Sequence, residues 1–161
     1  MIMKKFAVVL SCLVVLFFLS CAQKPVVHDV TKAVDTANKV LKNLMAGNYG
    51  DAYKYFTDEF KNQIDADAFA GSCGKNAGML GKWKKAEFKY YIDPKGKPDI
   101  ELIYSCDFTK GVEYPMHIIL TWFPDKGYEV GVLDYGYNFH PEAKGAEVTK
   151  MTIKDKVVLK P

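Results

Sequence analysis

Apolar residues recur at spacings of three and four along the stretch from Asp29 to Leu80, a pattern typical of amphipathic helices. In the first segment they share one helix face, and the charged residues take the other. These apolar positions are Val30, Val34, Ala37, Val40, Leu41, Leu44 and Met45. Asp29 can cap the start of this segment, and Gly47 can adopt the left-handed conformation that ends many helices. We therefore expect a first helix of about four turns.

The rest of this stretch predicts two further helical segments. Gly47-Asn48 separates the second from the first, and Gln63-Ile64-Asp65 separates the third from the second. Asn48, with Asp51 three residues later, is a weaker form of the capping box at the start of the second segment. Asp65 can cap the third segment and Gly81 can end it. The sequence thus predicts three helices before the first strand.

From Lys84 onward, apolar and polar residues alternate with the period of half-exposed β-strands. Four strands are predicted, at Ala86 to Ile92, Ile100 to Cys106, Met116 to Phe123 and Tyr128 to Tyr137. The third is nearly continuous in apolar residues, as expected of a central strand covered on both faces. The turn at Pro124 to Gly127 should join it to the fourth strand as an antiparallel hairpin. Gly131 and Gly136 indicate a bulge or close packing in the fourth strand.

Helices followed by strands, without an internal repeat, indicate an α+β fold. We expect N-terminal helices packed on a curved, mainly antiparallel sheet of about four strands. Residues 29–139 would form this single domain, a length that suits one hydrophobic core. The chain is 49% hydrophobic and 14% aromatic, so it has enough apolar side chains to fill that core. Residues 140–161 are left with two alternatives, a surface tail or an extra edge strand.

The first 20 residues have the order of a secretory signal, with lysines before an apolar run. That run, Phe6 to Leu19, is shorter than the roughly 18 to 20 residues that span a bilayer. It ends in Phe18-Leu19-Ser20-Cys21, which resembles the bacterial lipobox. The resemblance implies that residues 1–20 are removed and that Cys21 is acylated. Ordinary secretion and an uncleaved anchor are the alternatives, and Cys12 has too little apolar chain before it to be the acylated residue.

Lipid on Cys21 would hold the protein at a membrane, because more than one acyl chain gives stable attachment. Residues 21–28 would form a short tether, in which Ala22 to His28 span at most roughly 25 Å. Ala22, in place of an aspartate, resembles lipoproteins sent to the outer membrane of Gram-negative cells. We therefore expect a membrane-anchored protein of the cell envelope, on the periplasmic face of the outer membrane in such a host.

The charged residues argue against nucleic acid as a partner. The chain has 22 basic residues, and all of them are lysine. It therefore lacks the bidentate guanidinium that proteins favour for phosphate and guanine. Lys4 and Lys5 lie in the signal, so the mature chain would hold 20 lysines against 19 acidic residues. A nearly neutral chain with dispersed lysines is typical of a solvated surface.

Two cysteines, Cys73 and Cys106, remain after the signal. In an oxidising compartment they can form a disulfide, worth about 3 to 4 kcal/mol for the loop that it closes. Two buried free thiols are the alternative, because cysteine packs well as a small hydrophobe. No histidine lies at ligand spacing from either, and His140 with Glu142 offers two ligands without an evident third. We predict no metal site and no cofactor.

The order of elements resembles that of the nuclear transport factor 2-like superfamily, whose fold is cone-shaped. The motifs that carry the resemblance are Leu44 to Tyr53, Phe56 to Phe60, Phe69 and the segment from Gly78 to Gly81. It covers roughly Val30 to Asn138 and is greatest to small bacterial envelope members of unknown function. These are packing and capping motifs, so they imply a fold and hardly an activity.

Some enzymes of that superfamily, such as ketosteroid isomerase and scytalone dehydratase, place Asp, Tyr or His inside the cone. There, a carboxylate can act as a general base and a tyrosine hydroxyl can stabilise an oxyanion. Candidates for such a site are Tyr90, Tyr104, His117, Asp134 and Tyr135. None of them matches an enzyme motif of the family, and packed or solvent-facing side chains account for each. Isomerase- or dehydratase-like catalysis is therefore the alternative, not the main expectation.

The main expectation is non-catalytic binding. A cone leaves a concave pocket between helices and sheet, and Trp122 and Tyr135 are the residues expected to line it for a small apolar ligand. A third hypothesis has the outer sheet face, or the tail from Lys150 to Pro161, pair with an envelope protein or a second copy. A ligand site requires a cavity of at least about 300 Å³. An enzyme requires an ionisable group enclosed by apolar residues.

Overall fold

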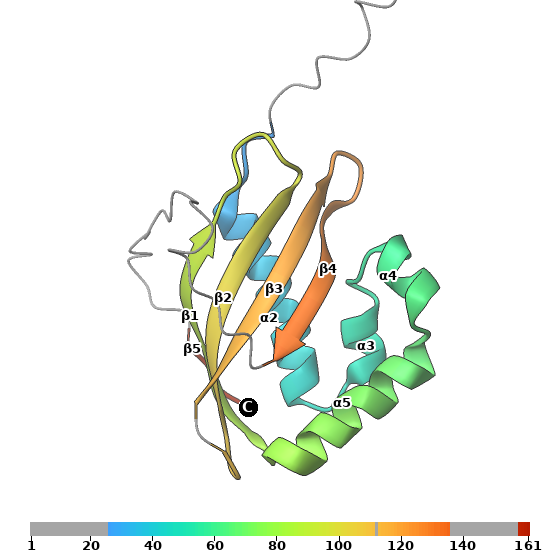
Figure 1. Ribbon diagram of the computed structural model, residues 1–161, viewed down its shortest axis with the longest axis vertical. Helices are drawn as coiled ribbons and strands as arrows, with labels where there is room; N and C mark the ends of the chain where they lie inside the picture. Colours follow the sequence, from blue (N-terminus) through green and yellow to red (C-terminus); the bar gives the residue numbers. More distant parts are fainter. Residues whose placement is uncertain (1–25, 112, 136–157) are drawn as a thin grey trace, which may run out of the picture.

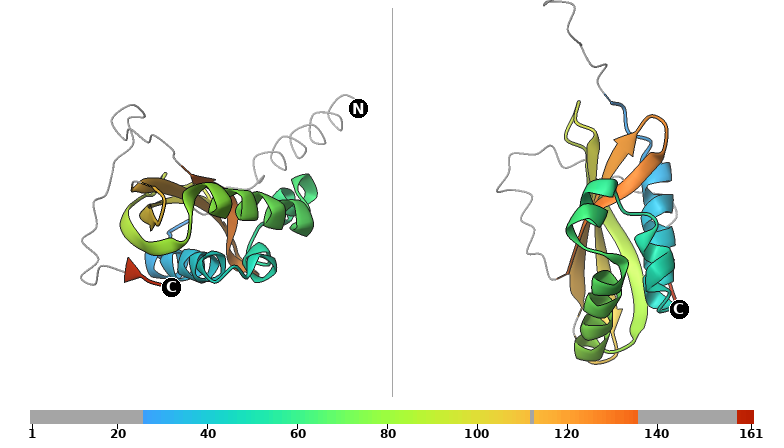
Figure 2. Two further views of the ribbon diagram at one scale, coloured as in Figure 1. Left: turned by 90° about the horizontal axis from the view of Figure 1, so that it is seen from below. Right: turned by 90° about the vertical axis from the view of Figure 1, so that its right-hand side faces the viewer.

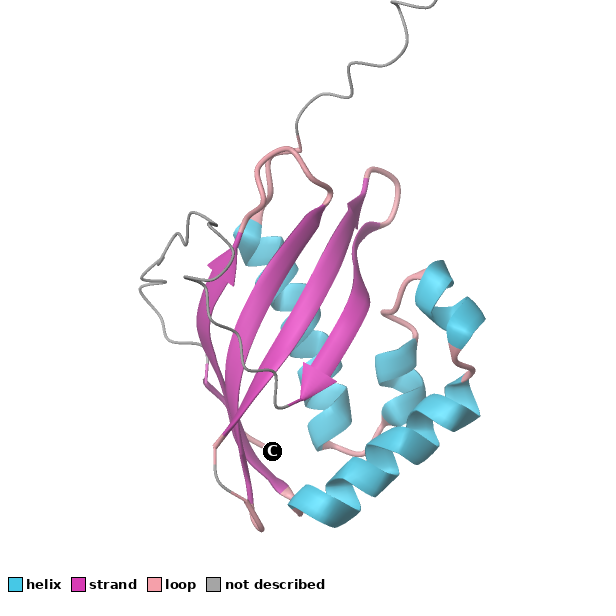
Figure 3. Cartoon of the chain, viewed as in Figure 1, coloured by secondary structure: helices cyan, strands magenta, loops and turns pink. Residues whose placement is uncertain are grey.

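The protein folds as helices followed by one antiparallel sheet, which confirms the predicted α+β class. This computed structural model describes residues 26–111, 113–135 and 158–161. The helices cover one face and one side of the open sheet (Figure 1, Figure 3). The helices are α2 (Val30–Met45), α3 (Tyr49–Tyr53), α4 (Asp58–Gln63) and α5 (Ala66–Leu80). The strands are β1 (Trp83–Ile92), β2 (Asp99–Phe108), β3 (Tyr114–Phe123), β4 (Gly127–Tyr135) and β5 (Val158–Leu159).

Helix α2 lies along one face of the sheet, as its sequence pattern predicts (Figure 2). Its buried residues are Ala33, Val34, Ala37, Val40, Leu41 and Leu44. At its start, the Asp29 carboxylate accepts a hydrogen bond from the Lys32 backbone N–H at 3.2 Å. After its last turn, Gly47 has a φ of 75°, the left-handed conformation that glycine adopts without strain. Both predicted ends of the helix are therefore confirmed.

The second predicted segment is not one helix, because an extended stretch divides it into α3 and α4. At this stretch the Thr57 N–H donates to the Val130 carbonyl at 3.0 Å, and the Val130 N–H donates to the Tyr55 carbonyl at 2.8 Å. The Thr57 hydroxyl then caps α4 by accepting from the Phe60 N–H at 3.2 Å. Asn48 makes no side-chain capping bond, so its predicted role in a capping box is wrong. Pairing with β4 thus overrides the local helical pattern.

Helix α5 begins and ends as the sequence predicts. The Asp65 carboxylate accepts from the Ala68 N–H at 2.8 Å, and Gly81 follows the last turn with a φ of 87°. Its buried residues, Phe69 and Cys73, face the core. The helix closes the end of the domain at which β1 begins (Figure 1).

Replacing Gly81 by alanine should destabilise the fold by at least about 2 kcal/mol. A side chain is strained at its positive φ, and the added Cβ would overlap the Thr109 hydroxyl and lie 3.0 Å from the Lys110 backbone N. Gly78→Ala is the matched control, because nothing lies within 4 Å of a Cβ there. That change should stabilise α5 by up to about 1 kcal/mol. Urea unfolding of both variants measures the difference, and equal stability would contradict the assigned geometry.

The sheet has the strand order β4-β3-β2-β1-β5, and neighbouring strands are antiparallel. The predicted hairpin is confirmed, with β3 and β4 joined by a turn in which Gly127 has a φ of 82°. β3 is interior, although the middle strand is β2. β5 pairs with β1 through Ala86 and Leu159 and lies at the edge of the sheet. Of the two alternatives for residues 140–161, a surface tail or an extra edge strand, β5 matches the second.

Bulges change which residues face the helices. In β4, Val130 pairs with Leu120 and Val132 with Ile119, so Gly131 is the extra residue of a bulge, as predicted. Gly136 lies outside the described residues. A second bulge, between Phe88 and Tyr90 in β1, was not predicted. It reverses the alternation beyond Phe88, so that Tyr91 takes the helix-facing side and Tyr90 pairs with Ile103 on the outer face.

The core lies between the helices and the inner face of the sheet. Its largest fully buried side chains come from α2, the α3–α4 stretch and the inner positions of β2, β3 and β4. They include Leu41, Leu44, Phe56, Ile100, Leu102, Tyr104, Met116, Ile118, Leu120 and Val130. This apolar layer holds α2 against the sheet. At the end of the layer, where α2 and α5 end and β1 begins, a cavity remains open.

Candidate functional site

A cavity of about 580 Å³ opens where α2 and α5 end and β1 begins; we call it the base cavity. Its apolar lining is Leu44, Met45, Tyr49, Ala77, Trp83 and Pro161. Turn residues complete it, because the Gly47 and Gly81 turns bring α2, α5 and β1 to one end of the domain. The volume exceeds the roughly 300 Å³ expected of a small-molecule site.

The lining of the base cavity suits binding better than acid–base chemistry. Its charged members are two exposed lysines, Lys82 and Lys110, and no Asp, Glu or His is among the described residues that line it. The Lys110 ammonium donates to the Gly78 carbonyl at 3.0 Å, whereas the Lys82 side chain extends into solvent. An apolar molecule could therefore bury its body in the cavity and keep an anionic end beside Lys82.

A second hollow, of about 510 Å³, lies between α4 and the outer face of β3 and β4. Its lining includes the carboxylates of Asp58, Glu59 and Asp99. Asp58 is paired with Lys126 at 2.8 Å, and the Thr121 hydroxyl donates to Asp99 at 2.7 Å. Asp58 and Asp99 thus have partners within the protein. Three carboxylates also make this lining a poor match for an apolar molecule, so the base cavity is the stronger candidate for an apolar ligand.

The two residues predicted to line one pocket lie at opposite ends of the domain. Trp122 packs against Tyr128, with ring centroids 5.0 Å apart, near the hairpin turn. Tyr135 instead packs 6.2 Å from Trp83, the aromatic residue of the base cavity. Burial raises the pKa of the Tyr135 hydroxyl above its usual range. Tyr135 thus supports the wall of the base cavity, while Trp122 belongs to a different hollow.

The catalytic candidates do not converge. Tyr104 is fully buried on the inner face of the sheet, where its hydroxyl donates to Asn38 of α2 at 2.9 Å. His117 and Asp134 are paired neighbours on the outer face. Asp134 is exposed, and His117 is buried beside Glu101, with Nε2 and Oε2 2.9 Å apart. The sheet therefore separates Tyr104 from the other two, and these three residues do not form one isomerase- or dehydratase-like site.

Cys73 of α5 and Cys106 of β2 are both buried and are free thiols in the structure. Burial raises the pKa of Cys73 to about 11 and that of Cys106 to about 12. Thiols protonated at neutral pH are poor nucleophiles, so in the reduced protein they act as core residues. Pairing of the two cysteines in an oxidising compartment stays a prediction.

These thiols make the stability of the reduced protein sensitive to alkali. The unfolded chain ionises them near their ordinary pKa of about 8.5, whereas the folded protein keeps them protonated. The stability that the protonated thiols contribute is fully present below the unfolded-state pKa of about 8.5. It is lost as the pH rises through the folded pKa values, about 11 for Cys73 and about 12 for Cys106. Urea unfolding should therefore show weaker stability at about pH 10 than at about pH 8. The Cys73→Ala, Cys106→Ala double variant should lose less over the same interval; an equal loss in both proteins would contradict this account.

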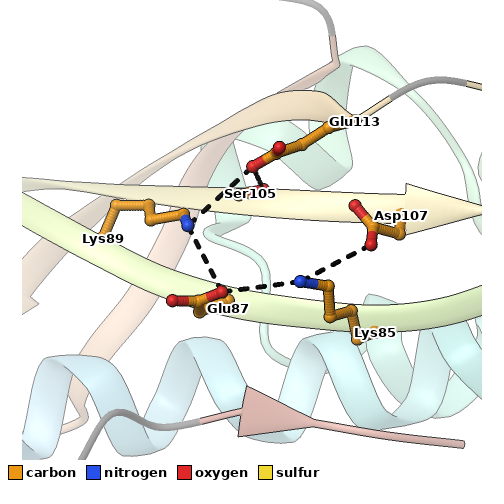
Figure 4. Close-up of polar contacts among 6 residues, drawn as sticks. All are labelled: Lys85, Glu87, Lys89, Ser105, Asp107 and Glu113. Atoms are coloured by element: carbon orange, nitrogen blue, oxygen red, sulfur yellow. Dashed lines mark hydrogen bonds and ion pairs between the residues drawn. The ribbon is translucent and has the colours of Figure 1, made fainter.

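The outer face of β1 and β2 carries charges rather than an apolar patch (Figure 4). The Lys85 ammonium lies 3.5 Å from the Asp107 carboxylate and 3.6 Å from the Glu87 carboxylate. The Glu87 carboxylate also lies 3.3 Å from the Lys89 ammonium. Lys89 is also 3.8 Å from Glu113, which accepts a hydrogen bond from the Ser105 hydroxyl. These pairs lie at the surface, with Glu87 and Asp107 partly exposed, and surface pairs of this kind add little stability. They keep this face polar, which disfavours apolar docking of a partner here.

His28 is a residue whose role the sequence pattern did not indicate. The tether was expected to extend through it, but its side chain is fully buried. Its Nε2 lies 3.0 Å from the Lys97 carbonyl and its Nδ1 lies 3.1 Å from the Tyr128 hydroxyl. Because a carbonyl oxygen only accepts, Nε2 carries a hydrogen and donates it to Lys97. A single histidine with partners 69 and 100 residues away gives no local signal.

Some predictions concern parts of the chain that the structure does not describe. Cys21, His140 and Glu142 lie outside the described residues. Within 26–111, 113–135 and 158–161, no helix is long and apolar enough to cross a membrane, and no three His, Cys, Asp or Glu side chains are grouped to hold a metal ion.

Comparison with known proteins gave no match to a protein-family model, a curated protein or a solved structure.

Proposed function

We propose that this protein is a lipid-anchored cell-envelope protein whose α+β domain binds a small apolar ligand in the base cavity without catalysis. The observation that carries the binding proposal is the cavity of about 580 Å³, with its apolar lining and the solvent-exposed Lys82 among its lining residues. The lipid anchor rests on the signal-like residues 1–20 and on Cys21. The resemblance to the cone-shaped superfamily is consistent with a pocket at such a place.

The position of the cavity suits a ligand taken from the aqueous side. α2 has 16 residues, so its ends lie roughly 24 Å apart. His28, the last residue of the tether, lies just before the first end of α2, and the base cavity lies at the other end, beside Leu44 and Met45. Figure 1 shows how α2 runs along the sheet between these two ends. An anchored protein would thus hold its binding site away from the lipid attachment.

Trp83 provides a direct test, because the chain has two tryptophans and only Trp83 lines the base cavity. The probe is 8-anilinonaphthalene-1-sulfonate, an apolar ring system with an anionic group. In a Trp122→Phe variant, bound probe should quench Trp83 emission by energy transfer, with saturation at micromolar concentration. In the Trp83→Phe variant, the remote Trp122 should be quenched much less.

Two further variants give the test its control. Ala77→Leu adds volume inside the cavity on a helical position and should weaken probe binding by about tenfold, the effect of about 1.4 kcal/mol. Ala70→Leu makes the same change in α5 at a position that does not line the cavity and should leave binding unchanged. Equal transfer from both tryptophans, or probe binding that Ala77→Leu does not alter, would contradict binding in the base cavity.

A further inference from the structure

The tether end of the domain carries a groove of its own. This groove, of about 330 Å³, lies between the first half of α2 and the β3–β4 hairpin; we call it the tether-side groove. Its aromatic residues are Tyr55, Trp122 and Tyr128, and its polar residues include Lys32, Asp35 and Lys39. The groove therefore combines aromatic rings with charges of both signs.

The groove is joined to the point where the tether enters the domain. Tyr128, one wall of the groove, forms a hydrogen bond between its hydroxyl and Nδ1 of the buried His28, and Nε2 of His28 donates to the Lys97 carbonyl. The residue before it, Val27, is 92% exposed. Because His28 is held on two sides, the chain reaches the domain in a fixed place. Whatever the tether is attached to therefore lies close to the groove, within the roughly 25 Å that residues 22–28 can span.

Three lysines, Lys32, Lys39 and Lys126, and one aspartate, Asp35, line the groove, and two of these lysines are paired with aspartates outside it. Lys32 is paired with Asp29 at 3.4 Å, and Lys126 is paired with Asp58 at 2.8 Å. Lys39 and Asp35 are both exposed and lie one turn apart on α2. A purely anionic ligand would have to compete with Asp29 and Asp58 for two of the three lysines, and it would be repelled by Asp35. A group with a phosphate and an ammonium fits better, because lysine pairs with the phosphate while aspartate and aromatic faces attract the ammonium.

We propose that the tether-side groove binds the zwitterionic headgroup of a phospholipid and so lays this end of the domain on the membrane. The inference rests on the proposed lipid anchor at Cys21. Tryptophan, tyrosine and lysine are the side chains that settle at a membrane–water interface, since each joins an apolar body to a polar tip. The domain then stands with its base cavity facing the aqueous side.

The two tryptophans report this orientation. Trp122 follows Thr121, which pairs with Asp99 at the start of β2. Trp83 pairs with Phe108 at the other end of β2. Ten residues of strand place Trp122 and Trp83 roughly 30 Å apart. The test uses the full chain, extracted as the host makes it and reconstituted in phosphatidylcholine vesicles with a nitroxide on a fraction of the headgroups. Trp122 emission, in a Trp83→Phe variant, should be quenched several-fold more than Trp83 emission in a Trp122→Phe variant.

The control variants are lysine replacements on α2. Lys32→Gln with Lys39→Gln, in the Trp83→Phe protein, should relieve most of the quenching of Trp122. Lys42→Gln, an exposed lysine on the same helix outside the groove, should not. A protein that floats with the vesicles but shows equal quenching of both tryptophans would overturn this inference and leave the anchor standing. A protein that does not float would overturn both. Quenching that requires phosphatidylglycerol and disappears in high salt would overturn the zwitterionic assignment.

Discussion

The Phe56→Ala variant is expected to lose about 3 to 5 kcal/mol of unfolding free energy, the largest loss that we predict for a single substitution. Phe56 is fully buried, and its ring centroid lies 4.3 Å from that of Phe60 and 5.0 Å from that of Phe69. The backbone at Phe56 also pairs with Val130 of β4. The side chain thus ties α4 and α5 to each other at the point where the helical layer meets the sheet edge. Removing it leaves a cavity and breaks aromatic contacts.

Urea unfolding followed by circular dichroism measures this loss, and Phe56→Leu is the control. Leucine keeps most of the apolar volume but not the ring contacts, so its loss should be about 1 to 2 kcal/mol. A Phe56→Ala loss below about 1 kcal/mol would mean that the aromatic cluster does not hold the helices on β4.

Cys21→Ser should abolish acylation of the protein in its own host and stop removal of residues 1–20. A serine hydroxyl cannot accept the thioether-linked lipid that the lipobox resemblance implies, and the sequence offers only one cysteine after a full apolar run. Intact mass of the membrane-extracted protein measures the change. The expected mass is that of residues 1–161 without lipid, whereas the unaltered protein should have the mass of residues 21–161 plus its acyl chains.

Cys12→Ser is the matched control, because it removes a cysteine from the same segment without touching the site of attachment. Acylation and cleavage should be unchanged in that variant. A Cys21→Ser protein that still carried lipid, or an unaltered protein without lipid, would remove the assignment to the membrane and with it the proposed cellular location.

The sequence pattern predicted the regular elements well where local chemistry decides them. The α2 stripe, the Asp29 and Asp65 caps, the Pro124–Gly127 hairpin turn and the Gly131 bulge are all present. Each depends on side chains within a few residues, so spacing and turn chemistry are sufficient. The predictions that failed depend on distant partners. Thr57 leaves the helical conformation because it pairs with Val130, and no local pattern contains that pairing.

The site was harder to predict than the fold, because its members come from segments that meet only in the folded chain. The base cavity joins Leu44, Trp83 and Pro161. Aromatic content alone suggested Trp122 and Tyr135 as one pair, yet the strand register places them near opposite ends of β3. The unpredicted bulge at Phe88 likewise moved Tyr90 to the outer face. Which face a strand residue occupies thus depends on register irregularities that alternation does not reveal.

The measurement that tests the central claim most directly is native mass spectrometry of the full-length product, extracted gently from the membranes of its own host. We predict an acylated monomer of residues 21–161 that retains a small apolar molecule, and the same protein with Ala77→Leu should retain much less of it. A dimer or a second bound protein in place of that molecule would favour the interaction hypothesis. An acylated chain that never carries a small molecule would contradict the binding function, and a chain without lipid would contradict the anchor.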